Sequence, residues 1–338
     1  MKNTSYQNTI KLFTNSGPFL NPQDQAVETY EFHTLELNGS LDEFAEFCQE
    51  SLNRFNNSES DNHLFVYTDE IGINAYKCSN SNTHVVCISI ELFREIREHL
   101  LISNCLFYAN NSDILNLNFN KSDISLLMYQ TALNFIFYHE TAHIYHSKNN
   151  KFNEVTSLNK PFSLANHVLE YDADIFSANT ITFHLFDYFE SLTKTEQTVS
   201  NLENIISLGL SSVFILFVFL HEEEIDFEDL KTLENTQVNN NVGNHPTTIT
   251  RITYIIDQVI LISNADSSLP SVEAKNIVHQ LFKLVECFYD GDNILMNILS
   301  ILESYDTQIM SHIEKLLLEA HKNPSVIKRR EILDDKFL

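Results

Sequence analysis

The stretch from Phe137 to His143, with the sequence FYHETAH, constrains this chain more than any other. It places two histidines four residues apart inside a long apolar run, and a helix would put both on one face. Each could then give one imidazole nitrogen to a single zinc ion. Glu140 lies about 100° further round the helix, where its carboxylate is directed at an attacking water rather than at the metal. The segment predicts the active-site helix of a zinc hydrolase, with His139 and His143 as ligands and Glu140 as the base.

A motif this short can also arise by chance, with odds of roughly a few in a hundred in a chain of this length and histidine content. Its surroundings argue against chance. Residues 128–144 carry apolar side chains on nearly every helical face, which predicts a helix that is buried almost all round. Histidines and a glutamate in such a helix need partners, because burying them unpaired costs several kcal/mol. A metal ion meets that need.

A catalytic zinc ion needs a third protein ligand, with the fourth position left for water. The metzincin pattern would place glycine at position 146 and histidine at position 149. The chain has His146 and Asn149 there, so the metzincin class is excluded. His146 and His167 remain fallback ligands.

A second predicted helix supplies a better third ligand. It begins after Ser163, whose side chain can cap its first turn, and extends to about Leu192. Glu170 and Asp174 are four residues apart and therefore share one face. We expect Glu170 to bind zinc and Asp174 to accept the free ring N–H of a ligand histidine, which fixes its tautomer. The alternative is an ordinary acidic face, but the apolar neighbours predict burial, where both carboxylates need partners.

The charge of the chain limits the kinds of partner that it can bind. With 21 basic and 46 acidic residues, the net charge is −25, which disfavours electrostatic binding to nucleic acid or anionic lipid. Five cysteines without a C-x-x-C pair predict neither a disulfide framework nor a cysteine zinc site, and they fit a reducing cytoplasm. Residues 1–21 lack the continuous apolar segment of a signal peptide. We therefore expect a soluble, cytoplasmic protein.

One segment raises the question of a membrane anchor. Residues 205–220 are largely apolar, but they are fewer than the roughly 20 residues that a helix needs to cross a bilayer. Three glutamates follow directly, at positions 222–224. A buried core helix is the favoured interpretation, and a membrane-associated protease is the alternative.

The remaining pattern predicts a mainly helical α+β fold. Short runs with strand character, separated by turn-forming polar residues, predict a small antiparallel β meander at residues 63–68, 72–78 and 84–90. A further short strand is expected at 29–37. The second half of the chain follows helical periodicity. We therefore expect an N-terminal α/β part over residues 1–120 and a helical, zinc-binding catalytic part over 121–338, unless the two form one continuous domain.

Three motifs together resemble a known family: His139-Glu140-x-x-His143, Glu170-x-Asp172-Ala173-Asp174 and His245-Pro246-x-x-x-x-Arg251. They look like the signatures of gluzincin peptidases of the HtpX type, and more closely those of Lit-type phage-exclusion proteases. HtpX-type enzymes carry clear membrane spans around their motif, whereas Lit-type proteins are soluble. The resemblance loosely covers residues 17–254. It implies a zincin-like pair of active-site helices and, for the first two motifs, the roles assigned above.

The third motif has two interpretations. His245 and Arg251 are candidate catalytic residues, as donors to the oxyanion, if this motif folds back over the site. Alternatively, the motif is a helix start with Pro246 in the first turn and Arg251 as a structural ion-pair partner.

These observations predict a zinc-dependent endopeptidase that acts on a protein substrate. The second class left open is a non-catalytic module in which zinc joins two helices and the protein acts by binding a partner. The intact Glu140 argues against that module, because a structural site needs no base. By resemblance to Lit-type proteases, the expected substrate is translation elongation factor Tu, cleaved after a phage-derived activator appears.

Overall fold

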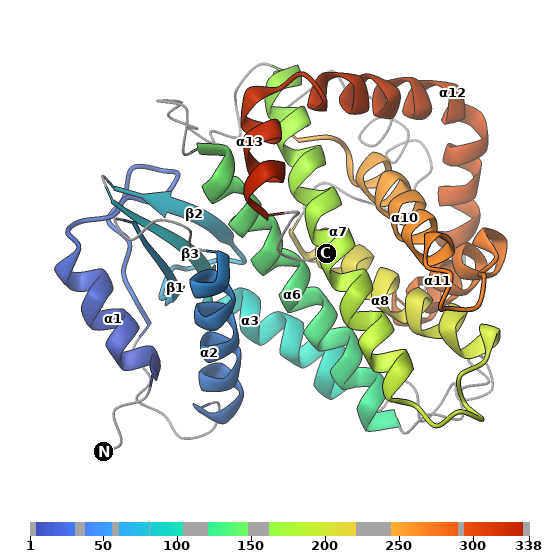
Figure 1. Ribbon diagram of the computed structural model, residues 1–338, viewed down its shortest axis with the longest axis horizontal. Helices are drawn as coiled ribbons and strands as arrows, with labels where there is room; N and C mark the ends of the chain where they lie inside the picture. Colours follow the sequence, from blue (N-terminus) through green and yellow to red (C-terminus); the bar gives the residue numbers. More distant parts are fainter. Residues whose placement is uncertain are drawn as a thin grey trace. The chain divides into compact units, whose positions relative to one another are not determined.

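The computed structural model describes residues 5–30, 38–55, 61–80, 82–103, 121–147, 162–220, 245–289 and 294–333. Within these ranges the chain is mainly helical with one small sheet, so the predicted α+β class is confirmed (Figure 1). The strands are β1 (Asn62–Thr68), β2 (Ala75–Ser79) and β3 (Thr83–Ser89). The helices are α1 (Ser5–Asn15), α2 (Asn38–Phe55), α3 (Ile90–Ile96), the π-helical η1 (Arg97–Ser103), α6 (Lys121–Ser147), α7 (Leu164–Ser191), α8 (Val199–Leu220), α10 (Thr248–Ala265), α11 (Ala274–Tyr289), α12 (Ile294–Ala320) and α13 (Pro324–Leu333).

The residues group into two compact units. The first unit contains residues 1–95, 136–160 and 321–338, and the second contains residues 96–135 and 161–320. Helix α6 contributes to both, since its first half belongs to the second unit and its second half to the first. The domain boundary expected at residue 120 stays a prediction.

The sheet of the first unit is mixed, so the predicted antiparallel meander is wrong. Its order is β1-β3-β2, with β3 parallel to β1 and antiparallel to β2. β3 lies at the centre, and nearly all of its side chains are buried, as suits a strand covered on both faces. Residues 69–74 carry the chain past β3 to the far edge, and a segment of this length spans up to about 20 Å, twice what two strand spacings require.

The strand expected at 29–37 is described only at its start. Thr29 forms an isolated antiparallel bridge with Thr68, and the Tyr30 N–H donates to the Tyr67 carbonyl over 2.9 Å. Residues 31–37 lie outside the described part of the chain.

Both faces of the sheet are covered by residues of the first unit. Phe13 of α1 and the nearby Phe19 pack on one face, in a buried cluster with Leu64, Val66, Tyr76, Cys78, Val85 and Cys87. The other face presents Phe65, whose ring centroid lies 5.7 Å from that of Phe44 in α2. The sheet is therefore a packed layer rather than an exposed surface.

Contacts with β1 and α2 also hold the second half of α6 in place. The ring centroid of Phe137 lies 6.1 Å from that of Phe65 in β1 and 6.4 Å from that of Phe44. Two turns later, the Tyr145 hydroxyl donates to the Phe55 carbonyl at the end of α2 over 2.9 Å. The H-E-x-x-H residues lie between these two anchors, so their backbone is held from both sides.

In the second unit, α7 packs against α8, α10 and α12. α8 is long and apolar enough to cross a membrane, but 94% of its most apolar window is buried. Gly209 allows close approach to α7, since a Cβ atom there would lie 2.7 Å from Leu185 Cδ1. This burial is compatible with the core helix of a soluble protein, the interpretation favoured from the sequence.

Candidate metal centre

The histidines of the first motif lie on α6 and are buried. His139 and His143 are each 7% exposed, and Glu140 between them is 8% exposed. The Nε2 atoms of the two histidines lie 3.1 Å apart. Two nitrogens bound to one tetrahedral zinc ion, at about 2.0–2.1 Å each, would lie about 3.3 Å apart. The spacing fits two imidazoles that turn the same ring nitrogen toward one ion.

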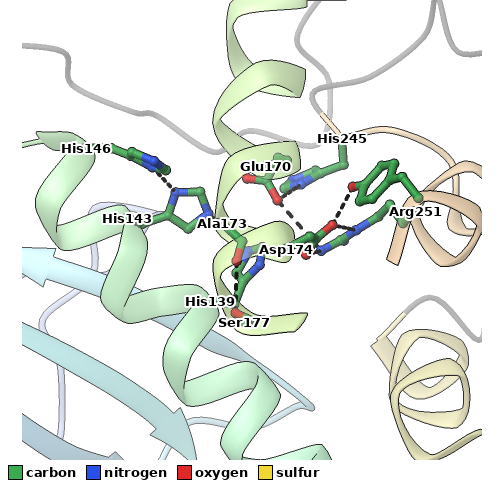
Figure 2. Close-up of polar contacts among 10 residues, drawn as sticks. His139, His143, His146, Glu170, Ala173, Asp174, Ser177, His245 and Arg251 are labelled. Carbon is green, nitrogen blue, oxygen red and sulfur yellow. Dashed lines mark hydrogen bonds and ion pairs between the residues drawn. The ribbon is translucent and has the colours of Figure 1, made fainter. Parts of the chain in front are cut away.

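His146 continues this row of histidines by one turn. It is 1% exposed, and its Nδ1 lies 3.3 Å from Nδ1 of His143 (Figure 2). The two nitrogens of the His143 ring are thus engaged differently: Nε2 faces His139, and Nδ1 faces His146.

The second motif lies on α7, where the predicted Ser163 cap is confirmed. The Asn166 N–H donates to Ser163 Oγ over 3.4 Å. Glu170, two turns into the helix, is 9% exposed. Its Oε2 pairs with Nδ1 of His245 at 2.9 Å and lies 4.0 Å from Nη2 of Arg251 (Figure 2). His245 and Arg251 of the third motif therefore lie beside the carboxylate of Glu170 in the second motif.

Asp174 is fully buried, one turn further along α7. Arg251 binds it in a fork, with Nε donating to Oδ2 over 2.8 Å and Nη2 to Oδ1 over 2.7 Å (Figure 2). The Tyr254 hydroxyl also donates to Oδ2, over 2.5 Å. The Arg251 guanidinium carbon in turn lies 4.3 Å from the centroid of the Phe217 ring. These contacts form a buried, hydrogen-bonded ion pair between α7 and α10.

The electrostatics of this network follow from its burial. Desolvation opposes the charge of Arg251, but the Asp174 carboxylate outweighs it and raises the pKa of Arg251 above its usual value. Burial, followed by the negative charge of Asp174, raises the pKa of Tyr254 well above its usual value. The guanidinium therefore stays charged and the phenol stays neutral. The contacts that Arg251 and Tyr254 make with Asp174 match the structural ion-pair interpretation of Arg251. The catalytic role of Arg251 and the role of Asp174 beside a ligand histidine stay predictions.

Helix α10 begins later than expected. His245 and Pro246 precede its N-cap residue Thr247, which has an extended backbone with φ −62° and ψ 153°. Pro246 is therefore not in the first helical turn, and that part of the prediction is wrong. His245 therefore lies in the segment before the helix, and from there its ring reaches Glu170.

Among the described residues, one group of three side chains could hold a metal ion: His139, His143 and Glu170. Each offers one ligand atom, and these atoms lie within 4.8 Å of one another. It is the ligand set expected from the sequence, and two imidazoles with one carboxylate suit a zinc ion. The fallback ligands are not members of the group.

His167, one of these fallback ligands, has another neighbour. It is fully buried on α7, and its Nδ1 lies 3.2 Å from Nε2 of His312 on α12. Burial, with a smaller effect of the Lys315 charge, lowers the pKa of His312 to about 4. This contact joins α7 and α12, and the low pKa of His312 leaves its imidazole neutral near pH 7.

Tyr254 is the participant that the sequence did not reveal. It follows Arg251 by three residues on α10, so the two side chains share a face and both reach Asp174. The only signal was a tyrosine at helical spacing from the motif arginine, and such a tyrosine is common in any buried helix.

The three grouped side chains are compatible with metal binding, and comparison with known proteins indicates the reaction. Residues 118–269 match the sequence profile of the family Peptidase U49. The matched range contains α6, α7, α8 and α10, and so includes all three motifs. No curated protein and no solved structure matches the chain. The match supports a peptidase family and a proteolytic function.

Proposed function

We propose that this protein is a zinc-dependent endopeptidase of the gluzincin class, similar to Lit-type proteases. The observation that carries the proposal is the group formed by His139, His143 and Glu170, beside Glu140, within the range that matches a peptidase family. Zinc is favoured over magnesium and calcium because imidazole nitrogens suit zinc, whereas those harder ions take oxygen ligands.

Glu140 is the proposed general base. It follows His139 directly on α6, so its carboxylate leaves the helix about 100° away from the ligand face. From there it takes a proton from the attacking water and later returns it to the leaving amine. When bound, a zinc ion would supply Lewis-acid polarisation of the scissile carbonyl and activate the water.

His245 and Arg251 are not equally suited to donate a hydrogen bond to the oxyanion. The side chain of His245 is 44% exposed, so it can still meet a substrate while Nδ1 holds Glu170. The side chain of Arg251 is only 6% exposed, and its fork is directed at Asp174. We therefore propose His245 as the donor nearest to the substrate and Arg251 as the residue that fixes the carboxylates of α7.

The sheet of the first unit offers a way to hold an extended peptide by main-chain pairing. The outer edge of β1 is already engaged. Gln49 donates to the His63 carbonyl over 2.8 Å and accepts from the Phe65 N–H over 3.3 Å, and the Tyr6 hydroxyl accepts from the Tyr67 N–H over 2.8 Å. We therefore propose β2, the strand at the opposite edge, as the strand to which a substrate segment adds.

The proposed substrate is a folded cytoplasmic protein. The net charge of −25 favours a protein over a nucleic acid as the binding partner. The resemblance to Lit-type proteases supplies the candidate, translation elongation factor Tu, and a phage-derived activator that releases the activity. Burial of α8 supports a cytoplasmic enzyme over the alternative of a membrane-associated, HtpX-like protease.

Metal analysis of the purified protein tests the site. We expect one zinc ion per chain in the wild type and in Glu140→Gln, and loss of most of it in His143→Ala and Glu170→Ala. Glu140→Gln should also abolish peptide cleavage, because the base is removed while the ligands remain. Full zinc retention by Glu170→Ala would contradict its assignment as the third ligand.

Expression in bacteria tests the substrate. Wild type and Glu140→Gln are compared with and without phage challenge, and elongation factor Tu is followed for a discrete fragment. A fragment in the wild type alone would support the proposal. Growth arrest by both variants would favour the non-catalytic zinc module instead, and absence of cleavage under every trigger would exclude this substrate.

A further inference from the structure

The row of histidines on α6 contains one that the proposed reaction does not use. His146 follows His143 by three residues, so the two side chains are neighbours on the helix surface. Their rings meet nearly edge to face, with centroids 5.3 Å apart and planes inclined by 67°. His146 is 1% exposed, so its side chain is enclosed by the protein.

The two contacts of His143 determine where its proton must lie. A histidine that binds a metal through Nε2 has no proton there, so its single proton is on Nδ1. Nε2 of His143 is the nitrogen that lies 3.1 Å from Nε2 of His139. Its Nδ1–H then points at Nδ1 of His146, 3.3 Å away (Figure 2). For this contact to be a hydrogen bond, His146 must accept at Nδ1 and carry its own proton on Nε2.

We propose that His146 is a positioning residue for the metal site, because it fixes the tautomer and the ring orientation of His143. The inference rests on the proposed zinc function and deepens it. Metal-binding histidines commonly donate their second N–H to a carboxylate, a carbonyl or water. Here an imidazole nitrogen on the same helix takes that place. His146 is thus not a ligand, since it meets the ring of His143 at the nitrogen that faces away from His139.

Substitutions that keep or remove the acceptor test this role. In His146→Asn the amide oxygen can occupy the position of Nδ1, whereas His146→Leu fills a similar space without an acceptor. Zinc affinity is measured by competition with a chromophoric chelator, and the unfolding temperature of each metal-free protein shows whether it folds. We expect His146→Leu to bind zinc about 10- to 100-fold more weakly than the wild type. His146→Asn should stay within about threefold of it, because the orienting hydrogen bond is kept.

Other outcomes overturn the inference. Wild-type affinity in His146→Leu would show that the contact does not orient His143, and equal losses in Leu and Asn variants would indicate packing alone. Zinc loss in both as complete as in His143→Ala would make His146 a ligand. If His146→Leu does not fold, His146→Gln replaces it, since its amide lies one bond further out and should also weaken binding. Failure of the proposed function is a separate result, because the wild type itself would then bind no zinc.

Discussion

Replacement of Arg251 by leucine separates its two possible roles. Arg251 is 5% exposed and Asp174 is fully buried, and their fork of hydrogen bonds measures 2.8 and 2.7 Å. Removing one member of a buried pair leaves the other charge without compensation, which costs about 3–5 kcal/mol. At about 2–4 °C per kcal/mol for units of this size, the unfolding temperature should fall by roughly 10 °C. Thermal unfolding followed by circular dichroism measures this shift.

The cause of the loss can be isolated with a second substitution. If the stranded charge of Asp174 is responsible, Asp174→Asn in the Arg251→Leu background should recover part of the stability, and the double variant should lose less than the two single losses combined. Tyr254→Phe is the matched control, because it keeps the ion pair and removes one hydrogen bond to a charged group, a loss of about 1.5–3 kcal/mol. A wild-type unfolding temperature in Arg251→Leu, together with lost proteolysis, would refute this reasoning and assign Arg251 to catalysis.

Three further outcomes follow from burial. Because the pKa of His312 is about 4 in the folded chain against its usual 6.5, the unfolded chain binds the proton more tightly, and stability should fall as pH is lowered across that window. Partial exposure limits the fall to about 1–2 kcal/mol, and His312→Gln should show a smaller decrease in unfolding temperature between about pH 7 and pH 5. Gly209→Val should destabilise the protein by about 1–3 kcal/mol in urea unfolding, because the new side chain meets Leu185, and an unchanged midpoint would contradict this close packing. Iodoacetamide should modify the partly exposed Cys287 of the native protein well before Cys48, whose complete burial raises the pKa of its thiol, and equal rates by peptide mass spectrometry would be inconsistent with this difference.

The grouped side chains were predictable because their placement is largely local. In a helix, positions four apart share a face, so the spacing of His139 and His143 already directs both rings to the same side. The cap at Ser163 likewise depends on residues within one turn. Glu170 required one step more, because it was the need of a buried carboxylate for a partner that made this residue a candidate ligand.

The sheet order was not predictable in this way. The spacing of the three runs is as compatible with a meander as with β1-β3-β2, because strand periodicity describes the two faces of a strand and not its neighbours. Burial does not decide the order either, since six of the seven side chains are buried in β1, at an edge, as well as in β3, at the centre. The order depends on long-range packing, to which α1 and α2 from elsewhere in the chain contribute.

The sequence by itself determined the helix that carries H-E-x-x-H, the shared face of His139 and His143 and the predominance of helices, because all of these follow from hydrophobic periodicity and short-range spacing. The tertiary structure alone decided the polar partners. Arg251 finds Asp174 at a separation of 77 residues, and Tyr254 finds the same carboxylate at a separation of 80. Such pairs form only where two helices bury their polar groups together. The reason is energetic, because a buried charge must be compensated by a hydrogen-bond donor or an opposite charge close to it in the folded chain. The spacing of residues in the sequence does not show which residue that will be.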